Sequence, residues 1–324
     1  MTAEQRDDRA RPLIVVALGG NAIQTMGDDD SVAADFRRTM DTAERLVGIA
    51  AEGWRLLVTH GNGPQVGNHL LRSELGNRHG GLPQLPLEVC VADTQGGMGY
   101  MLQQCLANAF AGTGLPGVVA TVVTQVLVER DDPAFSNPTK PVGETIPAHR
   151  VSELRDLGWS LEEDRRRGGW RRVVPSPDPL EVVEAAAVRA LLDDGVVVVA
   201  AGGGGIPVVQ RDDGSLEGVA AVIDKDLASA LLAADLKADA LLILTDVDRV
   251  YLDFDSPGQR ALDEVPVAEA RSYLESGQFG RGSMAPKVEA LCRFVENGGP
   301  RALLASIDDA SGALGGEAGT RVVP

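Results

Sequence analysis

Lysine is rare in this 324-residue chain, and its positions are the first indication of chemistry. Only four of the 30 basic residues are lysine, and the others are arginine. Three of the four lie in turns rich in glycine, proline or aspartate: Lys140, Lys225 and Lys287. Because arginine serves as the general surface cation here, a lysine kept in such a turn indicates a need for a compact charge on a flexible stem. The fourth, Lys237, is predicted to be an ordinary surface residue.

Ammonium groups that converge on one cleft would suit phosphoryl transfer. The transferred group spreads charge over its oxygens, and a protein contributes mainly cations and N–H donors placed around them. Asp226 precedes a helical stretch at 227–234, so its carboxylate could cap that helix or hold nearby lysines in position. Asp224 could orient backbone or metal-bound water. On spacing alone, the alternative of scattered surface lysines beside turns stays open.

The apolar pattern predicts the elements that must position these residues. Apolar runs alternate with stretches of helical periodicity, which is typical of a parallel sheet covered by helices. In an open α/β sheet, ligands bind at the carboxyl ends of the strands, where helix N-termini and free N–H groups converge. The glycine loops after several runs therefore mark one ligand-binding edge. The predicted strands are residues 13–18, 55–59, 118–128, 196–201, 241–245 and 301–305.

One segment departs from this alternation. Residues 129–178 contain prolines, aromatic residues and a charge run at 162–167. A plain loop of this length would be unusual in a compact domain, so the segment is predicted to form an inserted subdomain or lid. The charge run itself is predicted to be a solvated face.

Composition and charge exclude several classes of protein. The formal net charge of −17 repels nucleic acid and anionic membranes, so neither is an expected partner. Residues 1–11 carry charges of both signs and are not a secretory signal, and no apolar run reaches the roughly 18 residues that span a bilayer. We therefore expect a soluble, cytoplasmic protein.

Cysteine and histidine give no sign of a metal centre. Cys90, Cys105 and Cys292 form no Cys-x-x-Cys pair, so they are predicted to be buried, reduced thiols. The four histidines show no ligand spacing such as His-Glu-x-x-His, and we predict no metal site built from protein side chains.

Two common nucleotide motifs can be set aside. The sequence has no Gly-x-x-x-x-Gly-Lys-Ser/Thr loop, which excludes a P-loop site. The segment Gly61–Gly67 resembles a dinucleotide fingerprint, but its third glycine is one position late and Pro64 replaces a permissive residue. The absence of Gly-x-Ser-x-Gly also weakens a hydrolase interpretation.

Many segments resemble the carbamate kinases of the amino acid kinase family. They occur in the family's order and extend over nearly the whole chain after the first dozen residues. Asn21 favours this branch, because most amino acid kinases have lysine directly after the first glycine pair. The segments are Ala17–Ala22, His60–Gly67, Thr94–Tyr100, Asp132–Phe135 with Pro138–Pro141, Arg171–Pro177, Gly202–Pro207, Ala221–Ala228, Leu244–Val247 and Gly282–Lys287.

The resemblance implies a fold and an organisation. The expected fold is a three-layer αβα sandwich with an open, mainly parallel central sheet and a small protruding inserted subdomain, assembled as a homodimer. We predict a disordered segment at 1–12, a lobe for carbamate or carbamoyl phosphate at 13–236 that contains the insert 129–178, and a nucleotide lobe at 237–324.

The resemblance also implies an activity and a site. The expected reaction is reversible transfer of phosphate between carbamoyl phosphate and ADP, with Mg²⁺ on the nucleotide, in arginine catabolism. The catalytic candidates are Lys140, Lys225, Asp226 and Lys287. Substrate and phosphate candidates are Gly19, Gly20, Asn21, Gly61, Asn62, Gly63, Gly203 and Gly204. Nucleotide candidates are Thr245, Asp246, Val247, Tyr251, Met284 and Lys287.

We expect direct in-line transfer without a phosphoenzyme, because no motif pairs a nucleophile with a base. The N–H groups of Gly19, Gly20, Gly61 and Gly63 are expected to face the transferred group.

Three alternatives remain: a related kinase with another small carboxylate or carbamate-like acceptor, a non-catalytic sensor on the same fold, and a nicotinamide oxidoreductase. A panel of acceptors tests the related kinase. The retention of the four catalytic candidates argues against the sensor. An NADH titration tests the oxidoreductase.

Overall fold

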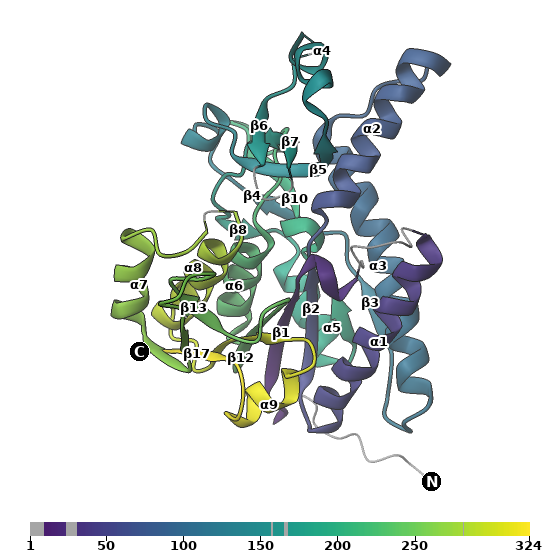
Figure 1. Cartoon of the computed structure of the whole chain (residues 1–324). Coiled ribbons are helices and arrows are strands. Elements are labelled where there is room, and N and C mark those ends of the chain that lie inside the picture. The colour runs from purple at the N-terminus through teal and green to yellow at the C-terminus, as the bar shows by residue number, and fades with distance from the viewer. Residues whose placement is uncertain (1–9, 24–30, 157, 165–167, 281) are drawn as a thin grey trace.

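An eight-stranded sheet forms the centre of the molecule (Figure 1). The structure is a computed structural model that describes residues 10–23, 31–156, 158–164, 168–280 and 282–324. The strand order is β15-β17-β16-β12-β1-β2-β9-β3, and neighbours run parallel except where β16 meets β17. The strands are β1 (Leu13–Leu18), β2 (Arg55–His60), β3 (Val119–Thr121), β9 (Val197–Val199), β12 (Ala240–Thr245), β15 (Glu264–Pro266), β16 (Ala302–Ser306) and β17 (Thr320–Val323).

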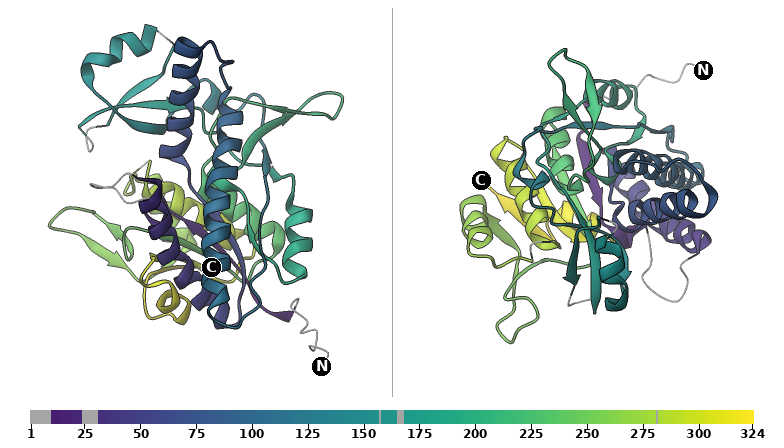
Figure 2. Two further views of the ribbon diagram at one scale, coloured as in Figure 1. Left: turned by 90° about the vertical axis from the view of Figure 1, so that its right-hand side faces the viewer. Right: turned by 90° about the horizontal axis from the view of Figure 1, so that it is seen from above.

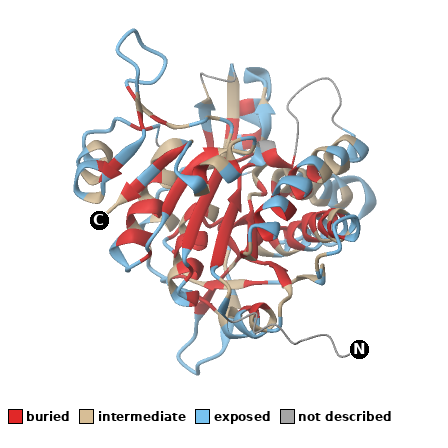
Figure 3. Ribbon diagram, turned by 90° about the horizontal axis from the view of Figure 1, so that it is seen from below, coloured by how far each residue is buried: buried red, intermediate tan, exposed pale blue. Residues whose placement is uncertain are grey.

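Helices cover both faces of this sheet, as the buried strands between them show (Figure 3). Successive side chains of a strand point to opposite faces. In β1, Val15 therefore packs in one core and Val16 in the other. The first core includes helices α5 (Ala185–Asp193), α6 (Lys225–Leu236), α7 (Val267–Glu275) and α8 (Met284–Glu296), and the second includes α1 (Val32–Ala51), α3 (Leu87–Ala111) and α9 (Ala310–Gly315). The predicted αβα sandwich with a mainly parallel sheet is confirmed.

The prediction of one strand over 118–128 is wrong. The segment forms β3 in the central sheet and β4 (Gln125–Leu127) in a second sheet, of order β11-β10-β4-β8. Gln95 fixes the break between them, because its side-chain amide bonds both the N–H and the C=O of Thr124, at 2.8 and 3.0 Å. The other strands of the second sheet are β8 (Glu181–Val182), β10 (Ile206–Gln210) and β11 (Leu216–Gly218).

The predicted insert protrudes beside α2 (Gly63–Gly80) and has a sheet of its own (Figures 1 and 2). Its strands are β5 (Lys140–Ile146), β6 (Leu161–Asp164) and β7 (Gly169–Val174), with helix α4 (Val151–Asp156). A small apolar cluster of Val151, Leu154 and Leu161 supports it. In the charge run, Glu162 and Glu163 are exposed, whereas residues 165–167 lie outside the described residues. A hairpin of β13 (Val250–Leu252) and β14 (Arg260–Leu262) follows β12.

The predicted N-terminal segment and lobes can be placed only in part. Residues 1–9 of the predicted disordered segment lie outside the described residues, but Arg11 already contacts the body, donating to the carbonyls of Gly53 and Trp54 at 3.0 Å. The boundary between the lobes, at the end of α6, stays a prediction. Within the described residues, none of the helices is long and apolar enough to cross a bilayer.

Gly67 allows the insert to dock on α2. A Cβ at Gly67 would lie 2.0 Å from the Cα of Gly143, a backbone atom of β5 that cannot give way alone. Gly67→Ala is expected to displace β5, which begins at Lys140, and to cost about 1–3 kcal/mol of unfolding free energy through overpacking. Urea unfolding would measure this cost.

Gly48→Ala provides the matched control. Gly48 lies within α1, is exposed, and has nothing within 4 Å of an added Cβ. Replacing a helical glycine at an open position stabilises by about 0.5–1 kcal/mol. Equal effects of the two substitutions would contradict the docking role of Gly67.

Candidate functional site

A cleft of about 650 Å³ opens at the carboxyl ends of the central strands, where ligands bind in open α/β sheets. It lies between the loops after β1 and β2, the start of β5 in the insert, the end of β12, and the N-terminal end of α8. The residues that line it are Gly19, Gly20, Gly63, Pro64, Lys140, Pro141, Arg171, Lys225, Thr245, Asp246, Val247, Tyr251, Asp253, Phe254, Ser276–Gly280, Gly282–Met284 and Lys287.

Three lysines from distant segments meet in this cleft. The ammonium groups of Lys225 and Lys287 both contact the carboxylate of Asp226, the second at 3.1 Å. Lys140 reaches across from the insert and pairs with Asp224. These contacts bring together the insert, the start of α6 and the start of α8. They are incompatible with the alternative of scattered surface lysines.

The electrostatics of the cluster follow from burial and from shared partners. Burial lowers the pKa of Lys225, and the charge of Asp226 opposes this only in part. Burial acts the same way on Lys287, but the charges of Asp226 and Asp224 outweigh it and raise the pKa of Lys287. Burial alone would raise the pKa of Asp226, yet the two lysines hold that pKa well below its usual range. Asp226 is therefore a carboxylate that keeps two ammonium groups side by side.

The prediction that Asp226 caps α6 is wrong, because Asp224 is the N-cap residue. Its Oδ1 accepts a hydrogen bond from the N–H of Asp226 at 2.9 Å. The N-cap position precedes the first helical residue, and that residue is Lys225. The second predicted role of Asp226, holding lysines, agrees with the contacts above. Lys237 is the C-cap residue directly after α6 and is exposed, as predicted.

Two of the four glycine N–H groups expected to face the transferred phosphate are occupied. The N–H of Gly19 donates to the carbonyl of Leu244 at 2.9 Å, and that of Gly61 to the carbonyl of Leu18 at 3.2 Å. Both bonds join loops to neighbouring strand ends, so the prediction is wrong for these two groups. Gly20 and Gly63 line the cleft and remain candidates. Position 19 still requires a glycine, because an added Cβ would lie 2.9 Å from the carbonyl oxygen of Leu244.

Four other phosphate candidates are not among the residues that line the cleft: Gly61, Asn62, Gly203 and Gly204. Asn62 is buried, and its amide donates to Thr94 at 2.8 Å. Gly203 has a positive φ and faces the side chain of Asn62, while an added Cβ at Gly204 would lie 2.5 Å from the carbonyl oxygen of Ile223. They support the loop that precedes α6. A Cβ added at Gly61 would lie 3.3 Å from the Cδ atom of Lys225. Asn21 lies in the short helix Gly20–Ala22, with its side chain outside what the structure describes.

His60 lies beneath the same loops as a neutral side chain. It is 1% exposed, and its Nδ1 contacts the carbonyl of Gly61 at 3.0 Å. Burial, the largest cause, lowers the pKa of His60 to about 4 from an ordinary value of 6.5. Between these values the unfolded chain binds more protons than the folded chain. Stability therefore falls as the pH drops through this window, by about 1.4 kcal/mol per unit.

His60→Gln is expected to remove this pH dependence. Relative to the variant, the wild-type protein should lose on the order of 3 kcal/mol of unfolding free energy between pH 6.5 and pH 4. Urea unfolding at both pH values would measure the difference. The control is His79→Gln, which replaces an exposed histidine near the end of α2. Identical pH dependence in all three proteins would contradict the buried, neutral state of His60.

The five other nucleotide candidates all line one end of the cleft. Thr245 is the last residue of β12, Asp246 and Val247 follow it, Tyr251 lies on β13, and Met284 begins α8. The hydroxyl of Tyr251 donates to Asp248 at 2.7 Å, so its ring is held at the cleft. Their role in nucleotide binding stays a prediction.

Among the residues that the structure describes, the cleft contains a cation that sequence reasoning missed, Arg171. It is 8% exposed, lies on β7, and donates to the carbonyl of Gly143 at 2.8 Å. Its place in the sequence could have indicated this. Side chains alternate between the two faces of a strand, so Arg171 shares a face with Val173, two residues later, and both are buried. The segment Ser276–Gly280, after α7, was also missed, and it shows no motif that would have identified it.

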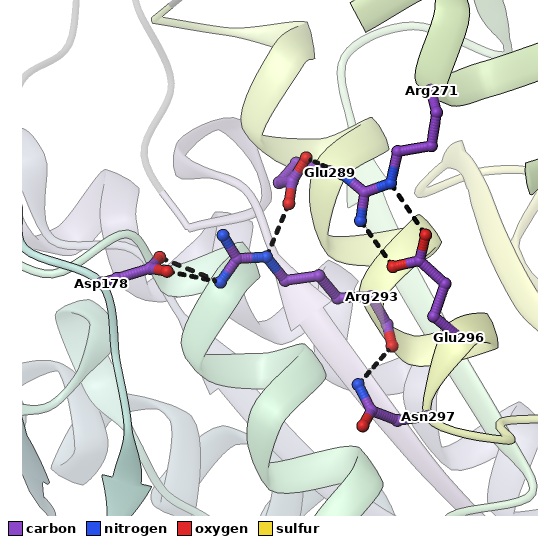
Figure 4. Close-up of polar contacts among 6 residues, drawn as sticks. All are labelled: Asp178, Arg271, Glu289, Arg293, Glu296 and Asn297. Atoms are coloured by element: carbon purple, nitrogen blue, oxygen red, sulfur yellow. Dashed lines mark hydrogen bonds and ion pairs between the residues drawn. The ribbon is translucent and has the colours of Figure 1, made fainter. Parts of the chain in front are cut away.

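An ion-pair network outside the cleft ties the end of the insert to α8 (Figure 4). Arg293 donates to both carboxylate oxygens of Asp178, at 2.9 and 3.0 Å, and to Glu289 at 2.6 Å. Arg271 of α7 contacts Glu289 and Glu296. Helix α8 carries Lys287, so the network fixes its orientation relative to the segment that follows β7.

The cysteines behave as predicted. Cys90, Cys105 and Cys292 are free and buried, and burial raises the pKa of each thiol. Among the described residues, no group of His, Cys, Asp and Glu side chains is arranged to hold a metal ion.

Comparisons with known proteins agree with this geometry. The model of the amino acid kinase family matches residues 12–306. A carbamate kinase of Pyrococcus furiosus is 46% identical over 312 residues, which cover 96% of this chain and 99% of that protein. The solved carbamate kinase of Giardia lamblia bound to citric acid has a TM-score of 0.90 and 39% identity, covering 97% of this chain and 99% of that one.

The same Giardia lamblia enzyme bound to AMP-PNP has a TM-score of 0.88 and 40% identity, with the same coverage. Similarity at this level extends over both ends of the cleft. The chain therefore belongs to the amino acid kinase family and, within it, to the carbamate kinases.

Proposed function

We propose that this protein is a carbamate kinase, which transfers a phosphoryl group between carbamoyl phosphate and ADP to give carbamate and ATP. The observation that carries the proposal is the meeting of Lys140, Lys225 and Lys287 in one cleft. Charge on a phosphoryl group in transit is spread over its oxygens, and positive groups fixed beforehand around it lower the barrier. Family membership supplies the identity of the substrates.

In the proposed reaction, a terminal oxygen of ADP forms a bond to phosphorus while the bond from phosphorus to the carbamate oxygen breaks. Lys225 and Lys287, paired on Asp226, balance charge on either side of the transferred group. Lys140 and Arg171 approach it from the insert. No residue is required as a nucleophile, so no phosphoenzyme forms.

We propose that Mg²⁺ enters with the nucleotide as part of the substrate. Mg²⁺ commonly keeps several waters and binds one or two carboxylates together with substrate phosphates. The donors in the cleft suit this mode, because Asp246 lines its nucleotide end and the described residues offer no ready-made cage. The ion would neutralise charge on the phosphates.

Three further properties belong to the proposal. Synthesis of ATP during arginine catabolism is the direction that the family resemblance suggests. A homodimer is the assembly that it suggests. The cytoplasm is the compartment we propose, because three free thiols suit reducing conditions.

A coupled assay for ATP formation from carbamoyl phosphate and ADP, with and without Mg²⁺, tests the function. We expect ATP formation that depends on Mg²⁺. The reverse reaction with ATP and a panel of small carboxylates tests the related-kinase alternative. Turnover of another acceptor, with none of carbamate or carbamoyl phosphate, would refute the proposal.

A further inference from the structure

Asp224 uses its two carboxylate oxygens for two different contacts, one with a helix end and one with a lysine. Its Oδ1 caps α6 by accepting from the N–H of Asp226 at 2.9 Å. Its other carboxylate oxygen, Oδ2, pairs with the ammonium group of Lys140. Asp224 is not itself one of the residues that line the cleft, but its carboxylate pairs with Lys140, the one lysine that the insert contributes to the lining.

The three lysines are not held alike. Lys225 and Lys287 share Asp226 and have side chains that are 11% and 14% exposed. Lys140 is 27% exposed and lies on the protruding insert, and its partner Asp224 is 12% exposed. Of these three lysines, Lys140 is therefore the most open to solvent and to an incoming anion, yet it already has a carboxylate partner.

We propose that Asp224 determines specificity by acting as a counter-charge that a correct substrate must displace from Lys140. This inference rests on the proposed function and deepens it. The carboxylate pairs with the same ammonium group of Lys140 that a phosphoryl oxygen would contact in the proposed reaction. A phosphoryl group must compete with it, and the negative charge of Asp224 remains next to the bound dianion.

The consequence is discrimination between phosphate esters or anhydrides and free phosphate. Inorganic phosphate brings charge alone, so the repulsion by Asp224 counts fully against its binding. Carbamoyl phosphate adds contacts through its carbamoyl end, and a nucleotide adds contacts along Thr245–Val247 and Tyr251. Such contacts offset the repulsion. The cleft thereby favours substrates over the phosphate that is abundant in any cell.

Asp224→Asn separates the two roles of the residue. Asparagine is as good an N-cap as aspartate, so its oxygen can keep the bond to the N–H of Asp226. The amide carries no charge and cannot serve as a counter-ion for Lys140. Asp224→Ser provides a second variant with a favourable cap and no charge.

Calorimetric titration with inorganic phosphate at low ionic strength measures the effect. We expect phosphate to bind both variants at least about tenfold more tightly than the wild type, since one unit charge at contact distance is worth more than this in a partly buried site. The inhibition constant of phosphate should fall more than the KM for carbamoyl phosphate. Adding Lys140→Met to Asp224→Asn should remove most of the gain.

The control is Asp193→Asn, which breaks a pair with Arg55 at 3.0 Å, at the amino end of β2 and away from the cleft. It should leave phosphate binding unchanged. Unchanged or weaker phosphate binding in both Asp224 variants would overturn the inference. Because the titration needs no turnover, this result is distinct from a failure of the wild-type enzyme to form ATP.

Discussion

Lys225→Met is expected to lower turnover by roughly 10²–10³, the loss typical of removing one preorganised stabiliser of transition-state charge. Methionine keeps much of the apolar stem, which lies against Gly61. The ammonium group is lost, and with it one of the two cations that Asp226 holds. Steady-state assays of ATP formation would show a fall in kcat larger than any rise in the KM for ADP.

Lys237→Met is the matched control, because Lys237 lies at the other end of α6 and is exposed. It should retain wild-type turnover. Lys225→Arg should not restore activity, since a planar guanidinium cannot occupy the place of a compact ammonium group on Asp226. A Lys225→Met protein with normal thermal stability and wild-type turnover would remove Lys225 from the mechanism.

Asp226→Asn is expected to reduce turnover about 10²-fold and to alter the pH profile. Asp226 is 2% exposed and is the shared partner of Lys225 and Lys287. Without its charge, burial lowers the pKa of Lys225 further, because the carboxylate no longer opposes it. Lys225 then loses its proton at a lower pH. The alkaline limb of the kcat/KM profile should move toward lower pH by about one unit or more.

The effect on folding has the same origin. Removing one partner from a buried ion cluster leaves uncompensated charge, which typically costs about 3–5 kcal/mol. Asp235→Asn, an exposed substitution of the same kind near the end of α6, is the control for both measurements. A profile for Asp226→Asn that kept its wild-type alkaline limb would show that Asp226 does not support the charge of Lys225.

Local pattern was sufficient to predict the framework. The fully buried run Leu13–Leu18 and its counterpart at 240–245 are apolar on both faces, as strands covered by helices on both sides must be. The failure at 118–128 is equally instructive. The stretch there is mostly apolar, with Thr121, Thr124 and Gln125 inside it, and the break depends on Gln95, a residue of α3 that bonds Thr124.

In the site, too, some features could be predicted from the sequence and others could not. Residue type and turn context selected Lys140, Lys225 and Lys287, because a scarce lysine in a constrained turn is a local signal. The sequence could not show that Asp224, and not Asp226, is the N-cap residue of α6. Both carboxylates lie close in sequence to the same helix end. The occupied N–H groups of Gly19 and Gly61 depend on neighbouring strands, which the order of residues does not reveal.

The amino-acid sequence by itself thus determined the sheet, the insert, the family and the cations, since each depends on residue type, short-range period or ordered motifs. Only the tertiary structure decided which carboxylate holds which lysine, that Arg171 enters the cleft, and which backbone donors are already used. Those outcomes depend on contacts between segments such as Lys140 and Asp224, and such contacts exist only once the chain is folded.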